Sequence, residues 1–296
     1  MPSHLTTPQR ARVGHTRLRA ERCAFTLIEL LVVVAIIGLL IGVLLPTLSG
    51  ARDAAKLVVQ QGNARQLMMG YAEYAIDRRD YVLPAMIDGN GFPDEIRVAP
   101  RDAAGNRIPL STQPGRRWFW HLAPYLNDAY DVMYRDQDLL EDLYGRNDYY
   151  EMTLYPGFGI NQRFVGGISA YRTNPLYGRS WGRSWYVQRT YDAKRPSGLM
   201  VFVSSAFTSG PTGFRDGYFR VEPPYFTAQN WTTMNAPGKG DEPTQSRNVW
   251  PVARGRVVAG FMDGHAEAME WGRASDMRLW APDADAPDWR MPPLTP

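Results

Sequence analysis

The feature that most constrains this chain is an apolar run of 24 residues, Phe25–Leu48, in which Glu29 is the single charged residue. As an α-helix this run is about 36 Å long at ~1.5 Å per residue, enough to cross a hydrocarbon core of ~30 Å. A secretory signal peptide has a shorter apolar run followed by a small-residue cleavage site, and the sequence shows neither. It therefore predicts a transmembrane helix at about 25–48, whose carboxylate costs roughly 2.5–3.5 kcal/mol to insert and needs a partner.

The charge of the chain is concentrated before this run. Residues 1–24 contain five arginines and one glutamate, a net charge of +4, so that residues 25–296 carry −1 of the total +3. Because arginines hold their side of a spanning helix in the cytoplasm, we expect a cytoplasmic N-terminus and a head on the other side. The nearly neutral head argues against a nucleic-acid binder. The sole cysteine, Cys23, excludes an intramolecular disulfide.

The stretch RCAFTLIELLVVVAIIGLL, residues 22–40, resembles the N-terminal signal of type IV prepilins and type II secretion pseudopilins. The resemblance implies that a prepilin peptidase cuts between Ala24 and Phe25 and methylates the new N-terminus. Glu29 is then the fifth residue of the mature chain, where it pairs with the terminal ammonium of a neighbouring subunit. Ala24 departs from the family, which usually has Gly there. A plain signal anchor, with Glu29 unpaired at headgroup depth, is the alternative.

The helix is expected to continue beyond the membrane to about residue 80. Apolar residues recur there at helical spacing, which predicts an amphipathic half whose stripe packs on a globular domain; they are Ala54, Leu57, Val58, Ala64, Leu67, Met68, Tyr71, Tyr74 and Ala75. Pro46 removes one hydrogen bond from the membrane half and predicts a kink there. The predicted domains are a basic leader at 1–24, a pilin-type helix at 25–80 and an extracytoplasmic head at 81–296.

The head is predicted to be α+β, with an antiparallel sheet on the second half of the long helix. Residues 198–206 have the pattern of a buried strand, and 255–271 that of a hairpin around Asp263-Gly264, a dipeptide suited to the positive φ angles of a tight turn. Residues 118–130 indicate a short helix or turn with buried aromatic side chains. Residues 85–115 and 208–248 are rich in turn formers, which predicts loops.

The hairpin carries a second resemblance. Asp263, Gly264 and His265 form a strand–Asp-Gly-His–strand element, which is similar to the end of a large group of pilin-like proteins abundant in planctomycete-type bacteria. That group often has a histidine that is separated from the Asp-Gly pair by nine residues. Ala253 occupies this position here, so the leading histidine is absent.

The sequence gives little support for catalysis or for a cofactor. Only His121 and His265 lie outside the leader, and no nucleophile elbow, phosphate loop or zinc motif is present. The chain is therefore predicted not to be an enzyme and to hold no metal or other cofactor. Calcium could bind the acidic stretch 131–150, but this stretch has no EF-hand loop, and a solvated helix face is the favoured interpretation.

The stretch 171–191 mixes arginine with aromatic residues and repeats Gly-Arg-Ser-Trp at 178–181 and 182–185. Arginine beside tryptophan can stack on nucleobases or sugars, so DNA or a surface glycan is one possible ligand. A twisted hairpin with tryptophan packed under arginine, or a contact between subunits, is favoured because no basic domain supports the local charge.

Taken with the first resemblance, these features imply a structural subunit of a bacterial inner membrane, crossing it once. It would be processed by the prepilin peptidase and assembled with other pilin or pseudopilin subunits, through the N-terminal helix, into a type IV pilus or a type II secretion pseudopilus. The alternative is a membrane-anchored extracytoplasmic binding protein of the same architecture that does not polymerise.

Overall fold

The computed structural model describes residues 26–182, 185–209, 213–227, 231–233, 235–238 and 240–294. The chain divides into two compact units, one ending at Gly50 and the other beginning at Ala51. Helix α1, Leu27–Asp77, has residues in both units. Its length of 51 residues confirms the expected long N-terminal helix.

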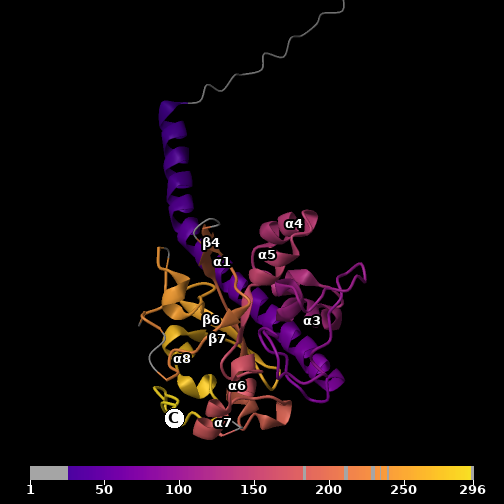
Figure 1. Ribbon diagram of the computed structural model, residues 1–296. Coiled ribbons are helices and arrows are strands. Elements are labelled where there is room, and N and C mark those ends of the chain that lie inside the picture. Colours follow the sequence, from indigo (N-terminus) through magenta and orange to yellow (C-terminus); the bar gives the residue numbers. More distant parts are fainter. Residues whose placement is uncertain are drawn as a thin grey trace, which may run out of the picture. The chain divides into compact units, whose positions relative to one another are not determined.

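Short helices surround a sheet in the second unit, the head. The α-helices after α1 are α2 (Gln113–Arg116), α3 (Trp118–Leu122), α4 (Gln137–Gly145), α5 (Tyr149–Leu154), α6 (Ser169–Thr173), α7 (Pro175–Trp181) and α8 (Trp271–Ala274). Short 3-10 helices lie at Ala123–Leu126, Tyr130–Met133, Thr190–Asp192, Pro196–Gly198, Pro243–Ser246 and Met277–Leu279. Helices α3, α4 and α5 lie together on one side of the head, and α8 lies beside β6 and β7 on the other (Figure 1).

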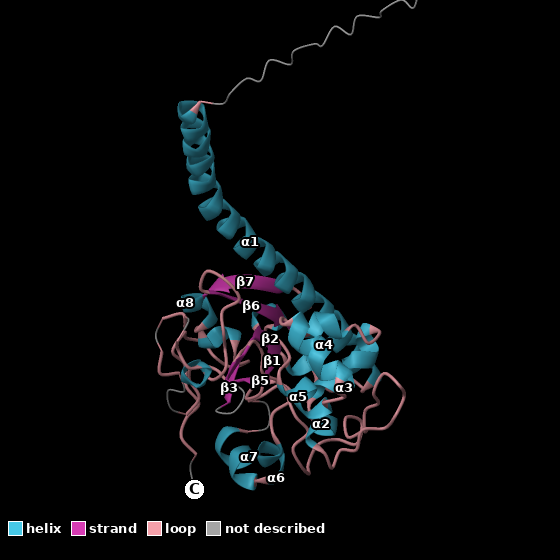
Figure 2. Cartoon of the chain, turned by 90° about the horizontal axis from the view of Figure 1, so that it is seen from above, coloured by secondary structure: helices cyan, strands magenta, loops and turns pink. Residues whose placement is uncertain are grey.

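The main sheet has the strand order β5-β1-β2-β6-β7 within the described residues (Figure 2). The strands are β1 (Phe158–Asn161), β2 (Met200–Ser204), β5 (Arg220–Val221), β6 (Arg256–Phe261) and β7 (Ala266–Glu270). All neighbours pair antiparallel except β1 and β5, which are parallel. Strands β3 (Phe207–Ser209) and β4 (Gly213–Arg215) form a separate small ribbon. The predicted α+β architecture is therefore confirmed.

The predicted strand and hairpin both form. Every residue of β2 is buried, as expected for a strand that has core on both faces. The hairpin β6–β7 pairs Arg256 with Glu270 and continues in register to Gly260 opposite Ala266. Alternate residues of β6 enter two different core clusters, Val258 on one side and Val257 with Ala259 on the other. Because successive side chains of a strand point to opposite faces of the sheet, β6 contributes to both clusters.

The second half of α1 packs on the sheet through most of the predicted stripe. Leu57, Ala64, Leu67, Met68, Tyr71, Tyr74 and Ala75 are buried. The contact is closest at Gly260, where an added Cβ would lie 2.7 Å from Met68 Cγ. Ala54 and Val58, which the sequence placed on the stripe, are exposed. Gln60 is buried although it is polar. Burial is therefore set by which surface of the helix faces the head, and not by apolar character alone.

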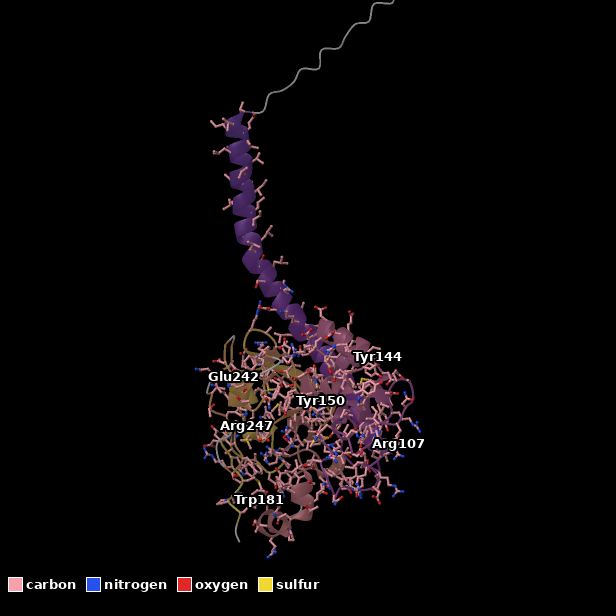
Figure 3. All side chains as sticks on the ribbon, turned by 45° about the horizontal axis from the view of Figure 1, so that its top comes forward. Arg107, Tyr144, Tyr150, Trp181, Glu242 and Arg247 are labelled. Carbon is pink, nitrogen blue, oxygen red and sulfur yellow. The ribbon has the colours of Figure 1, made fainter. Side chains whose placement is uncertain are left out.

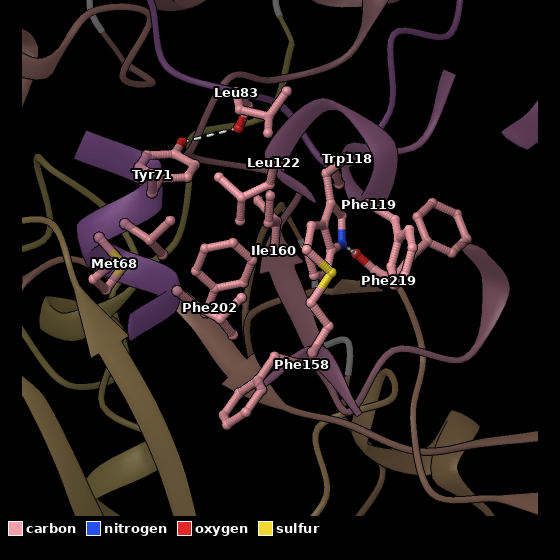
Figure 4. Close-up of a cluster of buried hydrophobic side chains, with 14 of the residues drawn as sticks. Met68, Tyr71, Leu83, Trp118, Phe119, Leu122, Phe158, Ile160, Phe202 and Phe219 are labelled. Carbon is pink, nitrogen blue, oxygen red and sulfur yellow. Dashed lines mark hydrogen bonds between the residues drawn. The ribbon is translucent and has the colours of Figure 1, made fainter. Parts of the chain in front are cut away.

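The core beside α1 is largely aromatic (Figure 4). Phe202 of β2 makes edge-to-face contacts with Tyr71, at 5.6 Å between ring centroids, and with Trp118, at 5.0 Å. The Tyr71 hydroxyl donates to the Leu83 carbonyl at 2.9 Å, and the Trp118 indole N–H donates to the Phe219 carbonyl at 2.9 Å. These bonds satisfy the polar atoms that burying such rings requires. The buried aromatic residues predicted at 118–130 are confirmed.

Two expectations about local structure were wrong. The segment 171–182 forms α6 and α7 and not a hairpin, because Asn174 accepts a hydrogen bond from the Leu176 N–H and caps a helix that begins with Pro175. Arg183 and Ser184 of the second repeat lie outside the described residues. Residues 208–248 are not only loops, since they contain β4, β5 and the end of β3.

Helix α1 ends at Asp77, close to the expected boundary near residue 80. Arg79 and Asp80 both have positive φ angles, of 54° and 67°. A left-handed backbone cannot continue a right-handed helix, so these two residues end it.

Candidate functional site

The start of α1 is the candidate site, and a reciprocal cap holds it. The Thr26 N–H and the Thr26 hydroxyl both donate to Glu29 Oε2, at 2.9 and 2.8 Å. In return the Glu29 N–H donates to Thr26 Oγ1 at 3.2 Å. This is a capping box, in which each residue satisfies a backbone donor that the helix leaves unpaired. Thr-x-x-Glu just before an apolar run is the sequence signal from which this role can be found.

The cap uses one oxygen of the Glu29 carboxylate. No described residue donates a hydrogen bond to Glu29 Oε1. The side chain is exposed, and the acid lies in the first turn of the helix, where the helix dipole stabilises negative charge. The cap therefore holds Glu29 in a fixed position at the start of the helix.

The helix after this cap is apolar and unpacked. Large aliphatic side chains from Leu27 to Leu48 are exposed, and Figure 3 shows side chains of this segment projecting from the ribbon. The helix is long and apolar enough to cross a membrane, although a signal sequence would pass the same test. An added Cβ at Gly38 or Gly42 would meet no atom within 4 Å. Exposure of an apolar surface of this size to water is unfavourable, so we expect lipid or other helices to cover it.

Several predicted site residues are not tested by the structure. Ala24 and Phe25, the residues of the predicted cut, lie outside the described residues. Pro46 falls within the backbone of α1, and the kink predicted there stays a prediction.

The Asp-Gly-His turn is ordered by its own side chains. Gly264 has a φ of 93°, which is the conformation that favours glycine in a tight turn. Asp263 Oδ1 accepts from the His265 N–H at 3.2 Å and lies 2.6 Å from His265 Nδ1. The imidazole stacks on Phe261, with ring centroids 4.2 Å apart. Partial burial raises the pKa of Asp263, but the hydrogen bonds from His265 outweigh it and hold that pKa below its usual value.

The other histidine of the head is buried and structural. His121 Nε2 donates to the Gly115 carbonyl oxygen at 2.8 Å. Burial, helped by the nearby Arg78 cation, lowers the pKa of His121 to about 4, so the ring is neutral near pH 7. It lies far along the chain from the exposed His265 turn and shares no contact with it among the described residues.

No cation site is evident in the part of the chain that the structure describes, where no group of three or more His, Cys, Asp or Glu side chains is placed to hold a metal ion. The acidic stretch predicted as a solvated face contains α4, whose Leu140 and Leu143 are buried. Its Asp142 pairs with Arg146 at 2.8 Å. Calcium binding by this stretch stays a prediction.

The aromatic residues of 171–185 contact one another. Tyr171 lies edge-on to Trp185 with centroids 4.5 Å apart, and Trp181 lies edge-on to Trp185 at 4.9 Å. The Trp181 indole N–H donates to the Pro292 carbonyl at 2.8 Å. The two tryptophans of the repeat therefore pack within the head. Binding of DNA or a glycan by this stretch is not tested.

A capped apolar helix with an acid in its first turn is what the resemblance to prepilin-like proteins predicts, and the comparisons with known proteins agree. The family described as the prokaryotic N-terminal methylation motif matches residues 19–45. The chain is also similar to the type II secretion system core protein G of Klebsiella michiganensis. The two are 30% identical over 125 residues, which cover 40% of this chain and 87% of the relative.

The chain therefore belongs to the prepilin and pseudopilin family, as a pseudopilin-like subunit. No solved structure matches it at comparable significance. The family is one of structural subunits, and the apolar helix fits a protein that crosses the inner membrane once. The second resemblance, to the group with the Asp-Gly-His hairpin, is not addressed by these comparisons and stays a prediction.

Proposed function

We propose that this chain is a structural subunit that is cut between Ala24 and Phe25 by a prepilin peptidase, methylated at Phe25, and assembled through the first half of α1. The product is a type IV pilus or a type II secretion pseudopilus. Before assembly the subunit crosses the inner membrane once, with its N-terminus in the cytoplasm and its head outside. The observation that carries the proposal is the geometry of Glu29 at the start of an apolar helix.

The two oxygens of Glu29 suit two simultaneous roles. Oε2 accepts both hydrogen bonds from Thr26, so the side chain is fixed without help from another molecule. Oε1 accepts none from the described residues, and it can receive the methylated ammonium of Phe25 from a neighbouring subunit. Two charges that are each expensive within a membrane neutralise each other in this contact. The contact also fixes how far one helix is displaced along its neighbour.

The experiment compares assembly in Glu29→Ala with assembly in two control variants. Membranes of the host strain are treated with a chemical crosslinker, and the oligomer ladder is read on an immunoblot. Glu29→Ala should lose the ladder while its mature chain keeps the same N-terminus. Glu73→Ala removes an exposed acid from the other half of the same helix and should keep the ladder.

A second control separates the charge from the cap. Thr26→Ala removes the capping hydroxyl but leaves the carboxylate, so it should weaken the ladder less than Glu29→Ala does. An unchanged ladder in Glu29→Ala, or no ladder in the wild type, would contradict assembly through this residue. The absence of a wild-type ladder would in addition favour the membrane-anchored binding protein that does not polymerise.

A further inference from the structure

A second feature of the head lies apart from the assembly helix, in a cavity of about 530 Å³. Its wall comes from chain segments that are distant in sequence, including α5, the start of β3 and the segment around β5. Aromatic rings dominate this wall; they belong to Tyr150, Tyr155, Phe207, Tyr218 and Phe219. The volume falls within the ~300–1,000 Å³ that small-molecule sites occupy.

Two arginines line the same cavity, and both contact one ring. The Arg117 guanidinium carbon lies 4.8 Å from the centroid of Phe219, and that of Arg220 lies 5.2 Å from it. Arg117 also lies over Tyr150, at 4.6 Å. Neither arginine forms an ion pair with any carboxylate of the described residues. The single acid in the lining is Glu151, so the ionised side chains of the cavity carry a net charge of +1.

Arg117 is 3% exposed, so its cation is buried without a carboxylate partner among the described residues. Nη1 donates to the Tyr150 carbonyl at 2.9 Å and to the Thr153 hydroxyl at 3.0 Å, but Nε has no hydrogen-bond partner. A buried cation is normally paired with an anion. Burial lowers the pKa of Arg117, and the nearby Arg220 cation contributes to the same shift. An anion that enters the cavity would supply the missing partner.

The wall around Arg220 is fixed before any ligand arrives. The Trp118 indole donates to the Phe219 carbonyl, and the Ser205 hydroxyl bonds both the carbonyl and the N–H of Tyr218, at 2.8 and 2.9 Å. Phe207 stacks face to face on Tyr218, with centroids 4.4 Å apart and an interplanar angle of 7°. A preformed wall loses little conformational entropy on binding.

We propose that this cavity binds a uronate, a sugar ring that carries a carboxylate, with the carboxylate paired with Arg117 and Arg220. Arginine recognises carboxylates through paired N–H donors, and aromatic faces pack against the apolar faces of ring ligands. The tyrosine hydroxyls and the Gln113 amide, which also lines the cavity, supply neutral hydrogen-bonding groups for sugar hydroxyls. A purely aromatic acid would have no use for them.

The two segments that carry the arginines are visible in the sequence as Arg-Arg-Trp-Phe-Trp at 116–120 and Tyr-Phe-Arg at 218–220. Arginine alternates with aromatic residues in both. Only the fold brings them together, since Arg117 and Arg220 are separated by more than a hundred positions. The cavity contains no residue of the stretch 171–191, for which the sequence left a glycan ligand open.

The test is isothermal titration calorimetry of the full chain in detergent micelles. The probes are a galacturonate trisaccharide, its neutral methyl ester, and benzoate. We expect saturable binding of the trisaccharide and binding of the ester that is at least about tenfold weaker, because the charge-assisted hydrogen bonds are lost. Benzoate, which lacks the hydroxyls, should bind at least about tenfold more weakly than the trisaccharide.

Arg220→Gln tests the site itself, because Arg220 is only half-buried and its replacement leaves the core intact. It should weaken trisaccharide binding at least about tenfold with an unchanged circular dichroism spectrum. Arg290→Gln is the matched control, since Arg290 also lies over a ring, that of Tyr225 at 4.9 Å, but outside this cavity; it should bind as the wild type does. The proposal is overturned if the trisaccharide does not bind, if ester or benzoate binds as well, or if both variants bind equally weakly. The comparison of probes on the wild type stands even if Arg220→Gln fails to fold.

Discussion

Glu29 makes intramolecular contacts that explain why the acid of this apolar helix lies three residues after Thr26. A carboxylate one turn into the helix reaches back to the unpaired Thr26 N–H, and the helix dipole favours its charge there. Glu29 is also the fifth residue of a chain that begins at Phe25, which fits the family's processing signal. The local cap and the proposed contact with a neighbour therefore require the same residue at the same position.

Thr26→Ala should loosen the start of α1. The Glu29 N–H loses its acceptor, Thr26 Oγ1, and loss of an N-cap side chain costs about 1 kcal/mol. In detergent micelles we expect the Glu29 amide to exchange its hydrogen about fivefold faster than in the wild type. Thr26→Ser keeps the hydroxyl and should exchange at the wild-type rate. Equal exchange in Thr26→Ala and Thr26→Ser would contradict the cap.

His121 should make the head less stable in acid. Because burial lowers its pKa from 6.5 to about 4, the unfolded chain takes up the proton first. The stability that the neutral ring contributes is present above pH 6.5 and is lost as the pH falls towards 4. The resulting decrease in the free energy of unfolding is at most about 3 kcal/mol.

Urea unfolding of the full chain in micelles, at about pH 7 and about pH 4, measures this effect. His121→Gln can still donate to the Gly115 carbonyl but does not titrate. The wild type should therefore lose more stability on acidification than His121→Gln, while carboxylates elsewhere affect both proteins alike. Equal losses would show that protonation of His121 is not coupled to unfolding.

Among the elements, the contact between α1 and β6 depends on the absence of a side chain at Gly260. An added Cβ would lie 2.7 Å from Met68 Cγ and 3.3 Å from the Ala64 carbonyl oxygen. Gly260→Ala should lower the free energy of unfolding by about 1–3 kcal/mol, because an overpacked core must shift to relieve the clash. Gly272→Ala, where an added Cβ meets no atom within 4 Å, is the control and should unfold at the wild-type urea midpoint. A normal midpoint for both would contradict the close packing.

The elements that the sequence predicted are those with local signals. Strand β2 is a short apolar run, and Asp263-Gly264 marks the β6–β7 turn. Strand β5 has only Arg220 and Val221, and its pairing with β1 joins residues about sixty positions apart, so no local pattern reveals it. Helix α7 has a local start signal, Asn174-Pro175, within a segment whose arginine and aromatic content favours a hairpin or a contact.

The same division applies to the candidate sites. The proposed assembly segment, the first half of α1, could be predicted from sequence because its residues are contiguous, and both the apolar run and Glu29 are visible without a fold. The cavity lined by Arg117 and Arg220 could not, since its wall is assembled from segments that only the tertiary structure brings together. The capping role of Thr26 is also predictable from sequence, because Thr-x-x-Glu is a local motif.

On the scale of the whole molecule, the buried core belongs to the second unit. No residue from Leu27 to Ser49 whose side chain the structure describes is buried, whereas the stripe that begins at Leu57 is. A chain of residues 51–296 should therefore fold in water without detergent, as a monomer with a cooperative thermal transition. Circular dichroism and size-exclusion chromatography measure this. A noncooperative transition or aggregation would show that the head needs the first fifty residues.

The central claim is that Glu29 acts from the fifth position of a processed chain, and mass spectrometry of the mature N-terminus tests it most directly. The protein is purified from membranes of its host and its N-terminal peptide is sequenced. We predict a chain that begins at Phe25 and carries a methyl group on its terminal nitrogen. An intact Met1, or a chain cut beyond Leu48, would contradict the account.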